Sequence, residues 1–168
     1  RKNKGLQDTL PRTWNMYNEI ARGYDELYYQ EQLDKLNIIK KHFKFQGKIL
    51  DIGAGTGIIS KHFENVTSVD PAEELLKQAK GKTVVAKAEK LPFPNNSFDT
   101  VVSLTALHHC DIDKAIKEIK RVSKAENYAF TILKKAKHFK EIVSKLKNNF
   151  NLKEIDEKKD LILISQTN

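Results

Sequence analysis

Short runs of apolar and β-branched residues recur along the chain, separated by glycine, proline and charged residues. Such runs predict buried strands of a sheet. We expect seven strands, at residues 48–52, 66–69, 83–86, 98–104, 128–133, 150–155 and 161–165. The last two are joined by polar residues only, which is typical of a hairpin-like connection.

Apolar residues at helical spacing fill most of the segments before and between these strands. We expect helices at residues 12–21, 31–43, 58–63, 72–79, 111–122 and 139–146. Asp111 or Asp113 can cap the fifth of these helices. Pro92 and Pro94 interrupt the segment between the third and fourth strands, so no long helix is expected there.

The alternation of strands and helices predicts an α/β fold in which a mostly parallel sheet is covered on both faces. The hairpin-like pair at the C-terminus predicts one antiparallel edge strand. A length of 168 residues fits a single domain. Within it we expect N-terminal helices in residues 1–44 and a sheet-containing core in residues 45–168.

Charge and composition narrow the classes of function. The formal net charge is +8, which suits a protein that approaches phosphate-rich polymers, although a solvated lysine-rich surface explains it equally well. The longest apolar runs fall far short of the roughly 18 residues that cross a bilayer, and the basic start is not followed by an apolar segment. We therefore expect a cytoplasmic protein without a membrane span. Cys110 is the only cysteine, which excludes an internal disulfide and a thiolate metal cluster, and no metal site is expected.

Three of the seven glycines, Gly53, Gly55 and Gly57, lie between the first strand and its helix. A glycine turn at this point lets backbone approach a ligand with helix N–H groups aimed at it. The dinucleotide fingerprint requires glycine where Ile58 stands, which disfavours NAD or FAD. Asp70, at the end of the second strand, can accept hydrogen bonds from both hydroxyls of a ribose. The alternatives are a glycine turn without a ligand and an Asp70 that only caps a helix.

Four segments in this order and spacing carry a family resemblance. They are DIGAGTG at residues 51–57, SVD at 68–70, AEKLPFPNNSFDTVVSLTALHH at 88–109 and AIKEIKRVSK at 115–124. From Tyr17 to about Ser165 the chain resembles the class I S-adenosylmethionine (SAM)-dependent methyltransferases. The resemblance implies a three-layer, Rossmann-like, doubly wound sheet, with SAM bound at the carboxyl ends of the first strands and S-adenosylhomocysteine as product.

The resemblance also implies which residues contact SAM. Asp51 and the glycine turn would hold the methionine end, Asp70 the ribose, Ala88 and Glu89 the adenine, while Ser103 and Leu104 would form the floor near the sulfonium. Tyr17 and Tyr24 match an aromatic lid, so residues 1–44 would cover the cofactor. The implied set is Tyr17, Tyr24, Asp51, Gly53, Ala54, Gly55, Gly57, Asp70, Ala88, Glu89, Ser103 and Leu104. Lys87 stands where relatives commonly carry an Asp that contacts adenine, which leaves that contact to Glu89 or to backbone.

His108 is the candidate catalytic residue, because a neutral imidazole after the fourth strand can accept a proton from the methyl acceptor. The alternative is that His108 and His109 only pack under the cofactor and cap a loop. Cys110 lacks the Pro-Cys context of pyrimidine-attacking nucleophiles. Residues 103–106 lack the Asn/Asp-Pro-Pro-aromatic tetrapeptide used to methylate amide and adenine amino nitrogens.

The methyl acceptor is the least determined feature. Only residues 134–138 separate the fifth strand from the next helix, so no cap encloses a small substrate, and lysines 134, 135, 137 and 140 would lie near the mouth. This favours RNA, either tRNA or rRNA, with a small activator protein as a potential partner. The alternatives are a small-molecule or protein methyltransferase and a non-catalytic module that binds SAM or a related adenosine compound.

Overall fold

The computed structural model describes residues 12–166, except for the side chains of residues 12–22 and 24. Within this part of the chain the strands are β1 (Ile49–Ile52), β2 (Val66–Asp70), β3 (Lys82–Val85), β4 (Thr100–Leu104), β5 (Tyr128–Leu133), β6 (Leu152–Asp156) and β7 (Asp160–Ser165). The helices are α1 (Arg12–His42), α2 (Ile58–His62), α3 (Glu73–Leu76), α4 (Ile112–Val122) and α5 (Phe139–Asn149), with a 3₁₀ turn η1 (Leu107–His109). All seven predicted strands are present, within two residues of the expected bounds.

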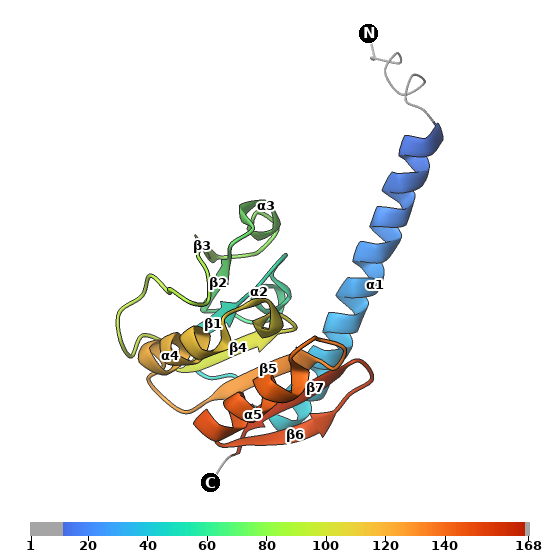
Figure 1. Cartoon of the computed structure of the whole chain (residues 1–168). Helices are drawn as coiled ribbons and strands as arrows, with labels where there is room; N and C mark the ends of the chain where they lie inside the picture. The colour runs from blue at the N-terminus through green and yellow to red at the C-terminus, as the bar shows by residue number, and fades with distance from the viewer. Residues whose placement is uncertain (1–11, 167–168) are drawn as a thin grey trace.

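The strands form one sheet in the order β3-β2-β1-β4-β5-β7-β6 (Figure 1). β7 runs antiparallel to both of its neighbours, and the pairs from β3 across to β5 are parallel. This confirms the α/β fold with one antiparallel strand, which lies one place inside the edge rather than at it. The reason is burial: β7 is buried along almost its whole length, whereas β6 exposes Lys153 and Glu154. The more polar strand therefore takes the edge, where charged side chains discourage pairing with other chains.

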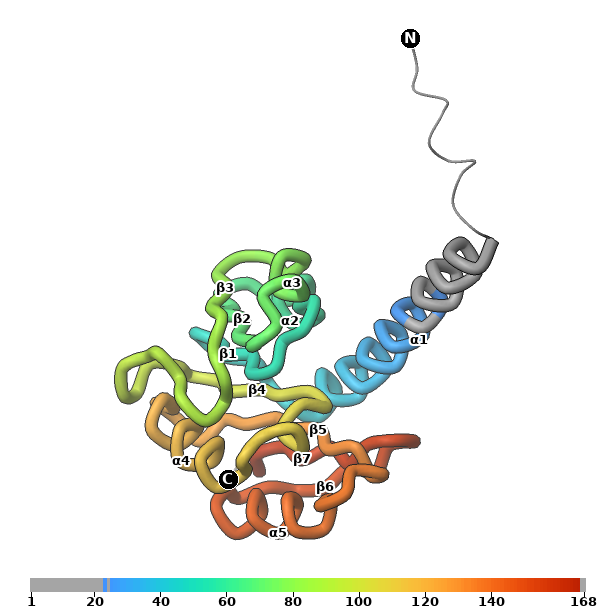
Figure 2. The backbone as a smooth tube through the Cα atoms, turned by 45° about the horizontal axis from the view of Figure 1, so that its top comes forward, coloured from blue at the N-terminus to red at the C-terminus, as the bar shows by residue number. Residues whose placement is uncertain are grey.

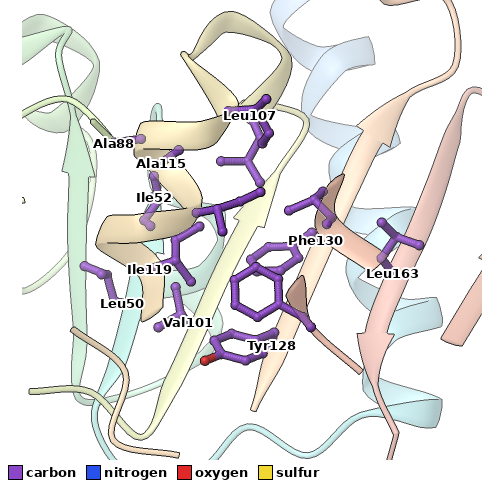
Figure 3. Close-up of a cluster of buried hydrophobic side chains, with 14 of the residues drawn as sticks. Leu50, Ile52, Ala88, Val101, Leu107, Ala115, Ile119, Tyr128, Phe130 and Leu163 are labelled. Carbon is purple, nitrogen blue, oxygen red and sulfur yellow. The ribbon is translucent and has the colours of Figure 1, made fainter. Parts of the chain in front are cut away.

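Two apolar cores cover the two faces of the sheet. On one face Leu50 and Val101 pack with Phe130 and with Ile119 of α4, as Figure 3 shows. On the other face Leu36 and the rest of the C-terminal part of α1 pack against β1, β4 and β7. Burial on both faces explains why the central strands read as continuous apolar runs.

Helix α1 differs from the prediction of two N-terminal helices. It is continuous from Arg12 to His42 and passes through Gly23. An internal glycine costs a helix only about 1 kcal/mol relative to alanine, and no proline follows within α1, so nothing forces a break. Figure 2 shows the helix extending away from the sheet, and accordingly Leu27 and Tyr28 are exposed whereas Leu36 is fully buried.

The segment between β3 and β4 contains no helix, as the two prolines predicted. It is held by α4: the Arg121 guanidinium donates to the carbonyl oxygens of Leu91 (2.8 Å) and Phe93 (2.6 Å), and Glu118 accepts from the Leu91 N–H at 2.7 Å. At the start of α4 the Asp111 carboxylate accepts from the Lys114 N–H, which confirms Asp111 as the cap. Helix α3 is a single turn, shorter than the periodicity at residues 72–79 predicted. No helix between residues 12 and 166 is both long and apolar enough to cross a membrane.

Candidate functional site

The glycine turn follows β1 at the point where the strand order reverses, since β1 has β2 on one side and β4 on the other. In open α/β sheets ligands bind at the carboxyl ends of strands at such a point. Gly53, Gly55 and Gly57 have φ angles of 69°, 55° and 83°, all in the left-handed region that favours glycine. The Ala54 N–H donates to the Val69 carbonyl oxygen at 2.9 Å, which ties the turn to β2.

The surroundings of the three glycines differ. A Cβ atom at Gly53 would lie 2.3 Å from the Ala106 Cβ, and one at Gly57 would lie 2.4 Å from the Ala79 Cβ. Both positions therefore require glycine for packing as well as for backbone conformation. A Cβ atom at Gly55 would meet nothing within 4 Å. Gly55 thus borders open space at the carboxyl edge of the sheet, where a ligand could approach the backbone.

Asp51 lies on β1 directly before the turn and is only 2 % exposed. Burial raises the pKa of this carboxyl well above its usual range, and the nearby Asp70 charge raises it further. Among the described residues, no hydrogen bond or ion pair reaches its side chain. Buried carboxylates are normally paired, so the arrangement suits a ligand that brings a positive charge.

Asp70 ends β2 and braces the glycine turn. One carboxylate oxygen accepts from the Gly55 N–H at 2.9 Å, and the other accepts from the Ala72 N–H at 2.8 Å. The N-cap position of α3 belongs to Ala72, so Asp70 is not the cap residue itself. A carboxylate has about four acceptor positions, so the two backbone bonds leave capacity for hydroxyl donors. Sequence reasoning did not predict these two backbone contacts, because they depend on the tertiary placement of the turn.

The remaining predicted cofactor residues differ in their surroundings. Ser103 is fully buried and donates from its hydroxyl to the Ile52 carbonyl oxygen at 2.8 Å, and Leu104 is buried beside it at the end of β4. Ala88 belongs to the apolar core. The Glu89 carboxylate is turned to the start of α4, where it accepts from the Asp111 N–H at 2.9 Å. The predicted lid residues are Tyr17 and Tyr24, and the side chains of both lie outside the part of the chain that the structure describes.

His108 lies in η1, just beyond β4. Its Nδ1 atom is buried and has no hydrogen-bond partner in the described structure. The pKa of the His108 ring is lowered first by burial and then by the neighbouring His109, whose ring centroid is 3.9 Å away. A lowered pKa keeps this imidazole neutral near pH 7, which is the form that can accept a proton. Burial raises the pKa of the Cys110 thiol to about 11, so Cys110 does not provide a thiolate there.

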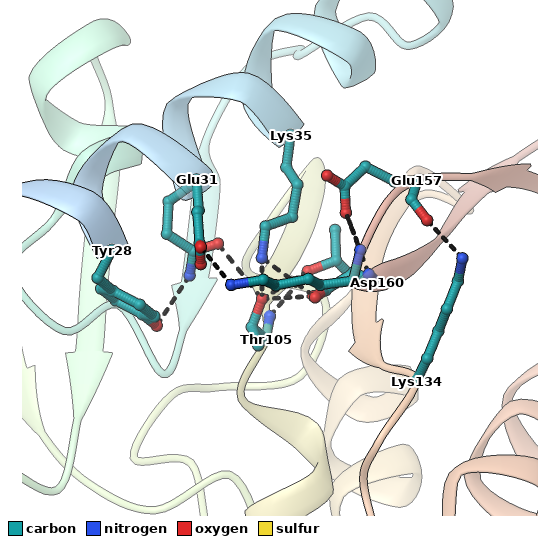
Figure 4. Close-up of polar contacts among 10 residues, drawn as sticks. Tyr28, Glu31, Lys35, Thr105, Lys134, Glu157 and Asp160 are labelled. Atoms are coloured by element: carbon teal, nitrogen blue, oxygen red, sulfur yellow. Dashed lines mark hydrogen bonds and ion pairs between the residues drawn. The ribbon is translucent and has the colours of Figure 1, made fainter. Parts of the chain in front are cut away.

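Sequence reasoning missed a buried ion pair whose two charges influence the pKa of His108. The Lys35 ammonium of α1 lies 3.1 Å from an Asp160 carboxylate oxygen at the start of β7, and both side chains are almost fully buried. The Thr105 hydroxyl joins them, accepting from Lys35 at 2.8 Å and donating to Asp160 at 2.6 Å (Figure 4). No local pattern links residues that are 55 and 70 positions apart in sequence, so sequence periodicity could not find this cluster.

Of the four lysines expected at the mouth of the site, one is held by contacts within the chain and three are exposed. The Lys134 ammonium lies 2.6 Å from the Asp156 carboxylate and also donates to the Glu157 carbonyl oxygen. Lys135, Lys137 and Lys140 are exposed. A cavity of about 610 Å³ between α1 and the β6–β7 connection is lined by three lysines, Lys134 among them, and by three acidic residues. A cavity of about 790 Å³ lies at the amino ends of β1 to β3. The glycine turn follows the carboxyl end of β1, so this cavity lies at the opposite edge of the sheet.

Comparisons with known proteins agree with this geometry. Residues 50–131 match the model of a methyltransferase domain family. An uncharacterized protein of Methanocaldococcus jannaschii, MJ1252, is 40 % identical over 124 residues, which cover 69 % of this chain and 49 % of that protein. The ubiquinone/menaquinone biosynthesis C-methyltransferase UbiE of Rickettsia bellii is 31 % identical over 137 residues, covering 66 % and 55 % of the two chains. This chain thus spans about half the length of these curated relatives.

A solved structure extends the match in fold to most of the chain. A SAM-dependent methyltransferase of Thermotoga maritima, described as a possible histamine N-methyltransferase, superposes with a TM-score of 0.66 at 18 % identity, covering 92 % of this chain and 99 % of that one. At this identity the likeness concerns the fold alone. The match to the family model includes the glycine turn, β2 and β4. The chain therefore belongs to the class I SAM-dependent methyltransferases.

Proposed function

We propose that this chain binds SAM at the glycine turn and transfers its methyl group to a small organic acceptor. The observation that carries the proposal is the unpaired, buried Asp51 carboxylate beside the open space at Gly55. SAM has an ammonium group at its methionine end and a positively charged sulfonium, and either charge would compensate a buried carboxylate. When bound, SAM supplies a methyl group that is already strongly electrophilic.

The other residues of the site then have distinct tasks. Asp51 binds the amino group, and the backbone from Gly53 to Gly57 borders the methionine end. Asp70 accepts hydrogen bonds from the ribose hydroxyls with the acceptor capacity left by its two backbone bonds. Ala88 and Glu89 border the adenine.

On the acceptor side, Ser103 and Leu104 form the floor near the sulfonium, and His108 acts as the base for acceptors that must lose a proton. The proposal also assigns residues 1–44, with Tyr17 and Tyr24, the role of a lid that covers the cofactor once it is bound. Alignment of the acceptor with the methyl group contributes much of the rate, as positioning does in other transfer reactions.

A small-molecule acceptor is favoured over RNA for two reasons. The relative UbiE is named as a C-methyltransferase of ubiquinone and menaquinone biosynthesis. Ubiquinone and menaquinone are small lipophilic molecules. The lysine-rich mouth that would have favoured RNA is also weaker than expected, because Lys134 is engaged by Asp156 and Glu157. RNA remains the second candidate, supported by the net charge of +8 and by three exposed lysines, Lys135, Lys137 and Lys140. An activator protein belongs to that second candidate.

Transfer from tritiated SAM tests the proposal. The full chain is incubated with labelled SAM and a cell extract, and the product is divided by nuclease treatment, protease treatment and organic extraction. We expect the label in a low-mass product that resists both enzymes. Nuclease-sensitive label would replace the small molecule by RNA, and protease-sensitive label would replace it by protein. SAM binding without any transfer would leave a non-catalytic SAM-binding module and overturn the enzyme proposal.

A further inference from the structure

The cavity of about 790 Å³ at the amino ends of β1 to β3 has no part in the proposed methyl transfer. None of the residues assigned to SAM or to the acceptor lines it. Its volume lies within the range of about 300–1,000 Å³ that is usual for small-molecule sites. Three lysines and three phenylalanines line it, together with a single acidic residue. The lining thus combines positive charge with aromatic surface.

The charged residues of the lining are Lys48, Lys80, Lys82 and Glu64, which give it a formal charge of +2. All three lysines are exposed. Among the residues with described side chains, no carboxylate pairs with these three ammonium groups, whereas the Lys134 ammonium is paired with one. The positive charge around the cavity is therefore left to solvent or to a ligand.

Aromatic rings form the walls between these charges. Phe63 follows α2, and Phe93 and Phe98 precede β4. The rings of Phe93 and Phe98 pack edge to face, with centroids 5.0 Å apart. Phe63 and Phe93 are only half-buried. The Lys82 ammonium lies 6.0 Å from the Phe93 ring centroid, which places a positive charge directly beside the apolar wall.

Hydrogen bonds hold the walls of the cavity in place. The Ser60 hydroxyl accepts from the Lys80 N–H at 3.0 Å and donates to the Gly57 carbonyl oxygen at 2.9 Å, which ties the segment before β3 to α2. The Arg121 guanidinium donates to the Phe93 carbonyl oxygen at 2.6 Å, which fixes the aromatic wall against α4. The cavity is therefore preformed, so a ligand does not have to order it.

Protection of the sheet edge does not explain all three lysines. Lys82 begins β3, the outermost strand on this side of the sheet (Figure 1), and a lysine there discourages pairing with another chain. Lys48 directly precedes β1, which has β2 on one side and β4 on the other, so Lys48 protects no edge. What the two lysines share is the aromatic cavity between them.

We propose that this cavity binds a small phosphate monoester with an apolar body. A phosphate monoester carries about −1.5 to −2 charges at pH 7, which matches the formal charge of the lining, and lysine is a common phosphate ligand. A single carboxylate would compensate only half of that charge. The apolar body lies against Phe63 and Phe93, where its burial adds to the affinity. The proposal does not rest on methyl transfer.

Calorimetric titration of the full chain with 1-naphthyl phosphate, without SAM, tests the proposal. We expect one site with a Kd below about 1 mM. Inorganic phosphate and 1-naphthol each keep one half of the probe and should bind at least about tenfold more weakly. Equal affinity for inorganic phosphate would exclude a role of the aromatic walls, and equal affinity for 1-naphthol would exclude a role of the lysines. Either result would overturn the proposal, as would no saturable binding of the probe.

Amide NMR shifts of the ¹⁵N-labelled chain locate the bound probe. We expect the largest shift changes at residues 63–67, 80–82 and 93–98, which border the cavity. Changes centred on residues 51–57 would place the probe at the glycine turn and overturn the proposal. A single-stranded RNA that displaces the probe at a lower concentration than 1-naphthyl phosphate itself requires would replace the small ligand by RNA.

Two double variants separate the cavity from net charge. Lys80→Gln with Lys82→Gln should weaken binding of 1-naphthyl phosphate by about tenfold or more, since charge-assisted contacts are lost. The matched control, Lys114→Gln with Lys153→Gln, removes the same charge from exposed positions on α4 and β6 and should keep the wild-type affinity. Equal losses in both would mean that net charge alone attracts the probe, and would overturn the proposal.

The outcome is distinguishable from that of the proposed function, because none of these titrations contains SAM or a methyl acceptor. If the probe binds at the cavity and the chain transfers no methyl group, the proposed function fails and the phosphate site stands. If methyl transfer occurs and the probe does not bind, the phosphate site fails and the proposed function stands.

Discussion

A substitution at Gly55 separates an effect on ligand binding from an effect on folding stability. Its φ of 55° requires a left-handed backbone, yet a Cβ atom there would meet no protein atom within 4 Å. Gly55→Ala therefore adds one methyl group to the open space where we propose that the methionine end of SAM lies. Gly81 provides a matched control, since its φ is 72° and the nearest atom to an added Cβ is the Val66 oxygen at 3.8 Å.

The expected cost in stability follows from these surroundings. A left-handed conformation costs an L-residue about 1–2 kcal/mol, so Gly55→Ala and Gly81→Ala should lower the free energy of unfolding by similar amounts. Gly53→Ala carries the same backbone cost together with a clash, because its Cβ would lie only 2.3 Å from the Ala106 Cβ. Overpacking adds about 1–3 kcal/mol, so Gly53→Ala should be clearly the least stable of the three.

Urea unfolding and calorimetric titration with SAM measure the two effects on the same proteins. We expect Gly55→Ala to lose SAM affinity by about 100-fold or more, as steric exclusion from a tight backbone contact implies, whereas Gly81→Ala keeps the wild-type affinity. Wild-type affinity in Gly55→Ala would refute the location of the ligand. Equal losses of affinity in Gly55→Ala and Gly81→Ala would mean that stability, rather than contact, controls binding.

Three more predictions concern side chains whose surroundings are unusual. Because burial raises the pKa of Asp51 in the folded chain, the free energy of unfolding should fall as pH rises from the ordinary carboxyl range toward the folded-state pKa. Asp51→Asn should remove this fall, add about 0.5–2 kcal/mol to the free energy of unfolding at neutral pH and weaken SAM binding. A variant that is less stable than the wild type in urea unfolding would contradict this. Cys110 should react slowly with iodoacetamide at neutral pH, with a rate that rises only as pH approaches about 11, and fast alkylation at neutral pH would exclude the raised pKa. Arg121→Ala should cost about 2 kcal/mol in urea unfolding and expose the segment around Leu91 and Phe93 to proteolysis, whereas an unchanged proteolysis pattern would count against that anchoring role.

The sheet could be predicted from the sequence because its strands are locally encoded. β-branched runs such as Val66–Asp70 and apolar runs such as Ile49–Ile52 are buried on both faces, and the glycines and prolines between them mark the turns. The position of β7 inside the edge was not predicted, since it depends on a comparison of burial between β6 and β7. The single helix α1 was missed because aromatic residues and Gly23 weaken its periodicity without breaking it.

The candidate site was predictable to the extent that it is contiguous in sequence. The glycine turn and Asp70 flank one helix of a strand–helix–strand unit, so their proximity follows from the fold class. The bonds from Asp70 to Gly55 and Ala72 required the folded turn. The ion pair between Lys35 and Asp160 joins an N-terminal helix to a C-terminal strand, and neither residue belongs to a motif.

Calorimetric titration of the full chain with SAM, S-adenosylhomocysteine and NAD tests the central claim most directly. If the turn from Asp51 to Gly57 holds the methyl donor, SAM and S-adenosylhomocysteine should each bind at one site, and NAD should produce no saturable heat. Binding of NAD more tightly than SAM, or no saturation by about 1 mM SAM, would contradict the assignment of this turn as a SAM-binding site.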